Sequence, residues 1–219
     1  MQLSERDLQL LSTLTHRVRS LSVRQLACRW WGQTSAPVQA ASRRLRRLEE
    51  GGHLELGEVL AHDPLEFERP LATWAPGEPT PALGAIAYQL RLTRWSGPLR
   101  PQRMVAATDL AVSRVGGVAG RLPRPAEGSH DLSLGALYLH HEAVYPARAQ
   151  RWSSESQLYA EGWGRNSVLP DAVVREGVVD GIHERERVVA IELAGRYSKA
   201  KLHGFHTFCY EEGLPYELW

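Results

Sequence analysis

The stretch SAPVQAASRRLRRLEEGG, residues 35–52, decides the fold expected for the first part of the chain. Serine at the start, proline in the first turn and two glycines at the end are typical helix boundaries. Helical periodicity places the apolar residues on one face and the polar and basic residues on the other. The apolar face consists of Val38, Ala41, Leu45 and Leu48, and the opposite face carries Gln39, Arg43, Arg46 and Arg47.

Two shorter helices are expected before this one, because Ser4 with Asp7 and Ser22 with Gln25 fit the pattern of a capping box. Two β-like stretches follow it, at residues 53–61 and 71–74, and we expect them to pair as a hairpin. Three short helices followed by a hairpin is the arrangement of a winged helix-turn-helix domain. We assign this domain to residues 1–76.

The third helix of such a domain enters the major groove of double-stranded DNA. Gln39 and Arg43 are expected to reach base edges, whereas Arg46 and Arg47 are expected to meet phosphates. Arg44 belongs to the same basic run, and Arg69 is expected at the wing. A solvated arginine face on an ordinary helical bundle, or a winged helix that binds protein, remains the alternative.

The charge distribution favours a polyanionic partner for this first segment. Residues 1–50 contain nine arginines and four acidic residues, which gives about +5, so the remainder carries about −4 of the total of +1. No apolar run approaches the roughly eighteen residues that a membrane-spanning helix needs, and the N-terminus lacks the pattern of a signal peptide. We therefore expect a cytoplasmic protein without a membrane partner.

The rest of the chain is expected to hold a helical connector and an α/β domain. The connector, residues 77–129, is predicted to contain helices at 82–95 and 100–117. Residues 130–219 show the order helix, three strands, helix, strand. The helices are expected at 131–144 and 198–212, and the strands at 148–153, 168–175, 187–193 and 214–219, with a turn at 177–181.

This order of elements resembles the PD-(D/E)XK nuclease fold. More narrowly, the chain resembles the replication-relaxation family, which joins a winged helix to a nuclease-like domain and occurs with plasmids and mobile elements. The resembling pieces are His130-Asp131-Leu132, Trp152-Ser153-Ser154-Glu155, Leu169-Pro170-Asp171 and Ile191-Glu192. The resemblance implies a metal-dependent DNA endonuclease.

Hydrolysis of a phosphodiester needs a divalent cation, and Mg²⁺ takes carboxylate, carbonyl and water oxygens. Asp171 and Glu192 meet that requirement if their strands pair as a hairpin, and Leu193 can supply a carbonyl. Glu155 is a third, outer carboxylate. We expect Mg²⁺ or Mn²⁺ as cofactor, with no zinc site and no organic cofactor.

In the resembling fold a lysine follows two places after the glutamate, but residue 194 is alanine. The 26 basic residues include only two lysines, Lys199 and Lys201, at the start of the next expected helix. Either could reach the site from that helix, and Lys201 is slightly favoured. The alternative is that both are solvated helix-start residues.

Three functions are therefore considered. The first is a metal-dependent DNA endonuclease that its own winged helix targets to DNA. The second is a catalytically inactive DNA-binding regulator of transcription or replication. The third, a protein-interaction scaffold, is disfavoured by the arginine-rich helix. A homodimer is expected by analogy with winged-helix proteins that bind palindromes.

Overall fold

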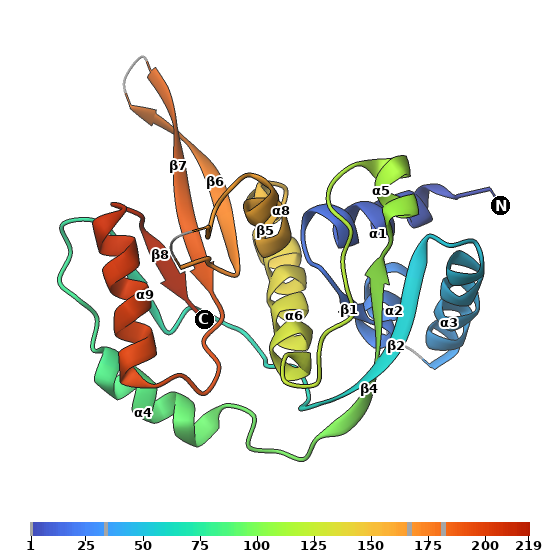
Figure 1. Cartoon of the computed structure of the whole chain (residues 1–219), viewed down its shortest axis with the longest axis horizontal. Coiled ribbons are helices and arrows are strands. Elements are labelled where there is room, and N and C mark those ends of the chain that lie inside the picture. The colour runs from blue at the N-terminus through green and yellow to red at the C-terminus, as the bar shows by residue number, and fades with distance from the viewer. Residues whose placement is uncertain (1, 33–34, 166–167, 181–182) are drawn as a thin grey trace. The chain divides into compact units, whose positions relative to one another are not determined.

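The computed structural model describes residues 2–32, 35–165, 168–180 and 183–219 and shows a mixed α/β chain (Figure 1). Two compact units are present, and each is assembled from two segments of the chain. Unit 1 comprises Met1–Pro64 and Gly97–Leu139, and unit 2 comprises Leu65–Ser96 and His140–Trp219. The boundaries expected after residues 76 and 129 do not coincide with this division.

Unit 1 begins with three helices, α1 (Glu5–His16), α2 (Val23–Trp30) and α3 (Ser35–Glu50). Both predicted capping boxes are present, with Ser4 at the start of α1 and Ser22 at the start of α2. Leu10, Leu26 and Leu45, one from each helix, are fully buried. The helices therefore share one apolar core, as the periodicity predicted.

The sheet of unit 1 has three antiparallel strands in the order β1-β4-β2. They are β1 (Leu21–Ser22), β2 (Leu54–Ala61) and β4 (Arg100–Ala107). The helix expected at 100–117 is therefore wrong in its first half, and only α5 (Asp109–Val115) is helical. Residues 104–107 are all buried because β4 is the central strand, and a short continuous apolar run does not distinguish such a strand from a helix.

The hairpin expected between residues 53–61 and 71–74 is also wrong. β2 pairs with β4, whereas β3 (Ala72–Trp74) pairs with β8 (Tyr216–Leu218) in unit 2. The chain thus leaves unit 1 after β2 and returns to it at β4. The hairpin was expected because β2 and β3 are close in the sequence. Each of them instead pairs with a strand that is more distant in the sequence.

Unit 2 contains a five-stranded sheet in the order β3-β8-β7-β6-β5. The central strands are β6 (Ala172–Asp180) and β7 (His183–Glu192), which form an antiparallel hairpin, and β7 runs parallel to β8. A turn was expected at 177–181, but β6 extends through residues 177–180, and residue 181 lies outside the described residues. The strand expected at 148–153 is instead α7 (Pro146–Ala149) followed by β5 (Trp152–Ser154), because Pro146 is set up for a first helical turn.

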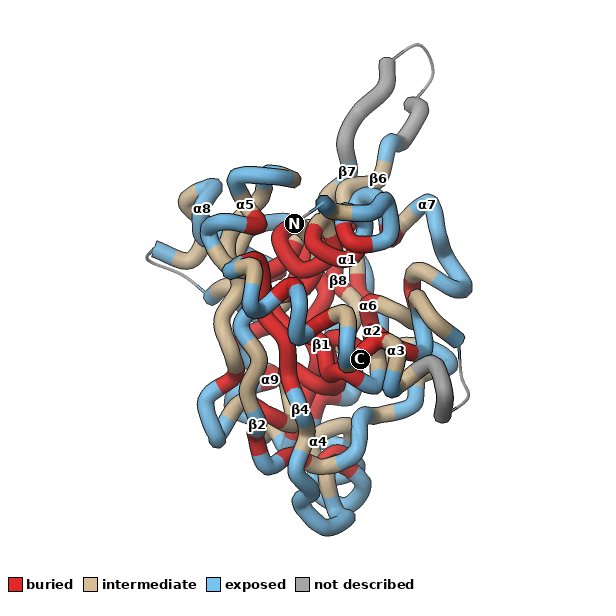
Figure 2. Tube along the Cα trace, turned by 90° about the vertical axis from the view of Figure 1, so that its right-hand side faces the viewer, coloured by how far each residue is buried: buried red, intermediate tan, exposed pale blue. Residues whose placement is uncertain are grey.

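Two helices cover the sheet of unit 2. α4 (Leu83–Thr93) and α9 (Lys199–Glu211) contribute Leu90, Leu202 and Phe205 to one core with Tyr216 of β8. Figure 2 shows the buried residues of the chain in red. α8 (Glu155–Ala160) follows β5 directly.

The boundary between the units falls inside α6 (Gly128–Val144). This helix begins three residues before the expected start, so Asp131 lies within its first turn and does not cap it. Among the described residues, we find no helix that combines the length and the apolar character needed to cross a membrane.

Candidate functional site

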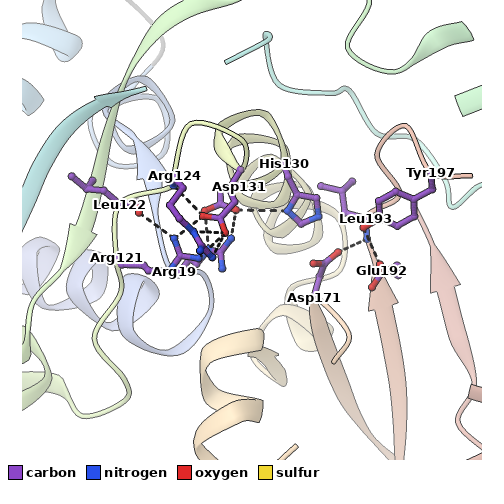
Figure 3. Close-up of polar contacts among 11 residues, drawn as sticks. Arg19, Arg121, Leu122, Arg124, His130, Asp131, Asp171, Glu192, Leu193 and Tyr197 are labelled. Atoms are coloured by element: carbon purple, nitrogen blue, oxygen red, sulfur yellow. Dashed lines mark hydrogen bonds and ion pairs between the residues drawn. The ribbon is translucent and has the colours of Figure 1, made fainter. Parts of the chain in front are cut away.

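The predicted catalytic carboxylates lie at one end of the β6–β7 hairpin. Ala172 and Ile191 are partners in the antiparallel register, so Asp171 and Glu192 are opposite one another at the next position. The Leu193 backbone N–H donates a hydrogen bond to Asp171 Oδ2 at 2.8 Å (Figure 3). The two acids are therefore brought together as the expected hairpin requires.

Glu192 is held in a buried position, with 6% of its surface exposed. The Tyr197 hydroxyl donates a hydrogen bond to Glu192 Oε1 at 3.1 Å, and the Trp219 backbone N–H donates to the Glu192 carbonyl at 2.8 Å. A buried carboxylate needs such donors, since an unsatisfied charge in the interior is costly. The end of β7 is thus held by hydrogen bonds to both the side chain and the backbone of Glu192.

Tyr197 lies at the centre of this acidic site. Burial raises the pKa of the Tyr197 hydroxyl far above its ordinary value, and the charges of Glu192, Asp171 and Glu155 raise it further. The phenol therefore stays protonated and acts as a donor. Sequence reasoning missed Tyr197, because a tyrosine in a loop between a strand and a helix carries no recognisable pattern.

The two lysines lie beside different residues. The Lys201 Nζ atom lies 3.5 Å from the centroid of the Tyr197 ring, which is a cation–π distance. Lys199 instead lies beside Gly84 of α4. Lys201 therefore sits next to the phenol that binds Glu192, while Lys199 packs toward the covering helix.

The third acid, Glu155, comes from the start of α8. Its backbone N–H donates to the Asp171 carbonyl at 3.0 Å, which links β5 to the start of β6. No group of three or more His, Cys, Asp and Glu side chains in the described ranges has the arrangement of a metal site. The donor set that fits Mg²⁺ is therefore limited to Asp171, Glu192 and the Leu193 carbonyl, a minimal set that leaves most positions to water.

The predicted DNA-binding residues of α3 divide into two groups. Gln39, Arg43, Arg46 and Arg47 are exposed, as expected. Arg44 differs, because its Nε and Nη2 atoms donate to the two oxygens of Asp7 on α1, at 2.9 and 2.5 Å. Burial alone would raise the pKa of Asp7, but hydrogen bonds from Arg44 and Ser4 hold it below its usual range. Arg44 thus joins α3 to α1, and its assignment as a DNA contact stays a prediction.

Arg69 is not placed at a wing of unit 1. It is exposed, but it belongs to unit 2, in the segment before β3. There it lines a small cavity together with Arg94. The expected position rested on the hairpin between residues 53–61 and 71–74, which does not form.

Comparison with models of protein families, with curated proteins and with solved structures finds no match. The resemblance to the replication-relaxation family therefore stays a prediction, and so does the expected homodimer.

Proposed function

We propose that the protein binds double-stranded DNA through α3. The observation that carries this proposal is the division of roles on that helix. Arg44 and the buried residues Ala41, Leu45 and Leu48 hold α3 in unit 1, whereas Arg43, Arg46 and Arg47 are exposed together on it. A helix anchored on one face and basic on the other is suited to contacts with phosphates and base edges.

The topology of unit 1 supports the same proposal. The elements follow in the order α1, β1, α2, α3, β2 and, later, β4. In the antiparallel sheet β2 and β4 form the long pair, and β1 is a short strand at its edge. This is the order of elements in a winged helix, with the third helix as the recognition element. In this interpretation the connection between the two wing strands is the whole segment 62–99.

The double substitution Arg43→Ala/Arg47→Ala is expected to weaken binding to a duplex oligonucleotide at least about tenfold, because two contacts to the polyanion are lost. The dependence of log K on log salt should become shallower by about two. Fluorescence anisotropy over a salt series measures both quantities. The matched control is Arg91→Ala/Arg114→Ala, which removes two exposed arginines outside α3. Equal losses in the two variants would contradict the assignment of α3.

A second candidate function is hydrolysis of DNA phosphodiesters at the acidic site. It is favoured by the position of Asp171 opposite Glu192, with Glu155 and Lys201 near the same tyrosine. Asp171, Glu192 and the Leu193 carbonyl are the residues that would hold Mg²⁺ or Mn²⁺, which supplies Lewis acidity when bound. Tyr197 orients the Glu192 carboxylate, and Lys201 offers positive charge to a phosphate from the position next to Tyr197.

Glu192→Gln and Asp171→Asn are each expected to reduce cleavage of plasmid DNA in Mg²⁺ or Mn²⁺ about a hundredfold, the typical loss when a group that stabilises the transition state is removed. Gel assays with matched protein concentrations measure the rate. Glu211→Gln, at an exposed position of α9, is the control that should cleave like the wild type. If the wild type binds DNA without cleaving it, the inactive DNA-binding regulator becomes the better description.

A further inference from the structure

Arg94, the residue after the end of α4, is buried to an unusual degree for an arginine. Only 9% of its surface is exposed. In the part of the chain that the structure describes, no carboxylate pairs with its guanidinium, and burial alone lowers the pKa of the group. A buried charge without a counter-charge is costly, so such a side chain is retained where an anion can reach it.

The side chain of Arg94 lines a cavity of about 210 Å³ inside unit 2. A water molecule occupies about 30 Å³ of liquid volume, so this space is ample for a phosphate group. Arg69 and Gln89 are exposed lining residues that can donate hydrogen bonds, whereas the Thr93 hydroxyl already donates to the Gln89 carbonyl at 2.9 Å. The other lining residues are Glu66 and the apolar side chains Phe67, Leu71, Leu90 and Trp219.

The backbone beside Arg94 is fixed by an unusual contact. Trp95 has a φ of 50°, in the left-handed region that residues with a side chain seldom adopt. Its ring occupies the space that a Cβ atom at Gly195 would take, since that atom would lie 2.6 Å from the ring. Strain of this kind persists where surrounding packing enforces it, and it is common at ligand sites. The backbone next to Arg94 is thus held by the packing of the Trp95 ring against Gly195.

We propose that this cavity is a phosphate-binding site in which Arg94 is the buried charged donor and Arg69 and Gln89 complete the donor set at the opening. The planar fork of a guanidinium matches two oxygens of a phosphate group, and such charge-assisted bonds are among the strongest in proteins. The two arginines outweigh the single acid, Glu66, so the lining favours an anion. The phosphate can belong to a free ion or nucleotide, or to the backbone of DNA.

The test uses the full chain in the presence of EDTA, so that it does not depend on metal or on cleavage. Inorganic phosphate is compared with sodium chloride at equal ionic strength, by isothermal titration calorimetry and by thermal unfolding. The wild type should bind phosphate and unfold at a higher temperature in it. Arg94→Met should weaken binding at least about tenfold, which corresponds to about 1.4 kcal/mol, and should lose the thermal shift.

Two further variants separate this effect from damage to the fold. Arg91→Met, on the same helix but exposed, should keep the whole response to phosphate. Arg69→Gln changes an exposed residue of the opening and should lower the affinity several-fold without a change of stability. In buffer without phosphate, Arg94→Met should unfold at or above the wild-type temperature, because an apolar side chain replaces a buried unpaired charge.

Competition experiments then identify the source of the phosphate. If duplex DNA displaces inorganic phosphate, the cavity accepts a backbone phosphate; if both bind together, it accepts a free one, and either result supports the site. A wild type that responds equally to phosphate and chloride overturns the proposal, as does an Arg94→Met variant that keeps the phosphate response. Neither outcome depends on whether α3 binds DNA or the acidic site cleaves it.

Discussion

Replacing Asp131 with asparagine is expected to lower the free energy of unfolding of unit 1 by about 3–5 kcal/mol, the typical cost of breaking a buried ion pair from one side. Asp131 is 2% exposed and accepts hydrogen bonds from Arg19 Nε at 2.7 Å and from Nη2 at 2.5 Å (Figure 3). Burial alone would raise the pKa of Asp131, yet His130 and Arg19 hold it below its ordinary range. The asparagine removes the buried carboxylate that the partly buried Arg19 guanidinium binds with two hydrogen bonds.

Urea unfolding at pH 7, followed by circular dichroism, measures this loss. Asp109→Asn, in the first turn of α5, removes an exposed carboxylate and should cost less than about 1 kcal/mol. The double variant Arg19→Met/Asp131→Leu removes both charges and should recover most of the lost stability. A loss below about 1 kcal/mol in Asp131→Asn would show that the pair contributes little.

Glu217→Gln is expected to destabilise unit 2 by about 3 kcal/mol at pH 7, and this loss of stability should disappear at acidic pH. Glu217 accepts hydrogen bonds from Arg148 Nη2 at 2.7 Å and from Trp219 Nε1 at 3.0 Å, and His141 lies 3.9 Å away. Burial alone would raise the pKa of Glu217, but these donors lower it from 4.5 to about 2.

The sign of the pH dependence follows from this lowered pKa. The pKa of Glu217 in the unfolded chain is 4.5, and above that pH the ionised carboxylate contributes its full stability. This contribution is lost as the pH falls to the folded-state pKa of about 2. Urea unfolding between pH 7 and pH 2.5 should therefore show that the difference in free energy of unfolding between the wild type and Glu217→Gln becomes smaller as the pH falls. Glu212→Gln, which is exposed, should not show this behaviour. If the difference in free energy of unfolding stays the same at every pH, the loss of stability comes from packing and not from the charge of Glu217.

Local signals predicted much of the structure. The capping serines fixed the starts of α1 and α2, and the apolar stripe fixed the buried face of α3. The β-branched run before Glu192 marked β7 and placed the acid opposite Asp171. These features depend on residues that are near each other in the sequence, and short-range patterns report them well.

The features that sequence reasoning missed depend on long-range partners. β4 is a strand because β1 and β2 flank it, and β3 pairs with β8, far along the chain. Arg44 donates hydrogen bonds to Asp7, and the Tyr197 hydroxyl donates a hydrogen bond to Glu192. No local pattern records such a partner, so neighbouring arginines of one basic run have different structural surroundings.

The path of the chain between β2 and β4 has a consequence for how the protein is made. On the ribosome, β2 emerges long before β4, and the intervening segment cannot complete its own unit until β8 has been synthesised for β3 to pair with. Pairings between such distant segments close late and fold slowly. Unit 1 can therefore mature while the chain is still growing, whereas β3 and α4 must wait, with their apolar surfaces uncovered, until β8 has been made.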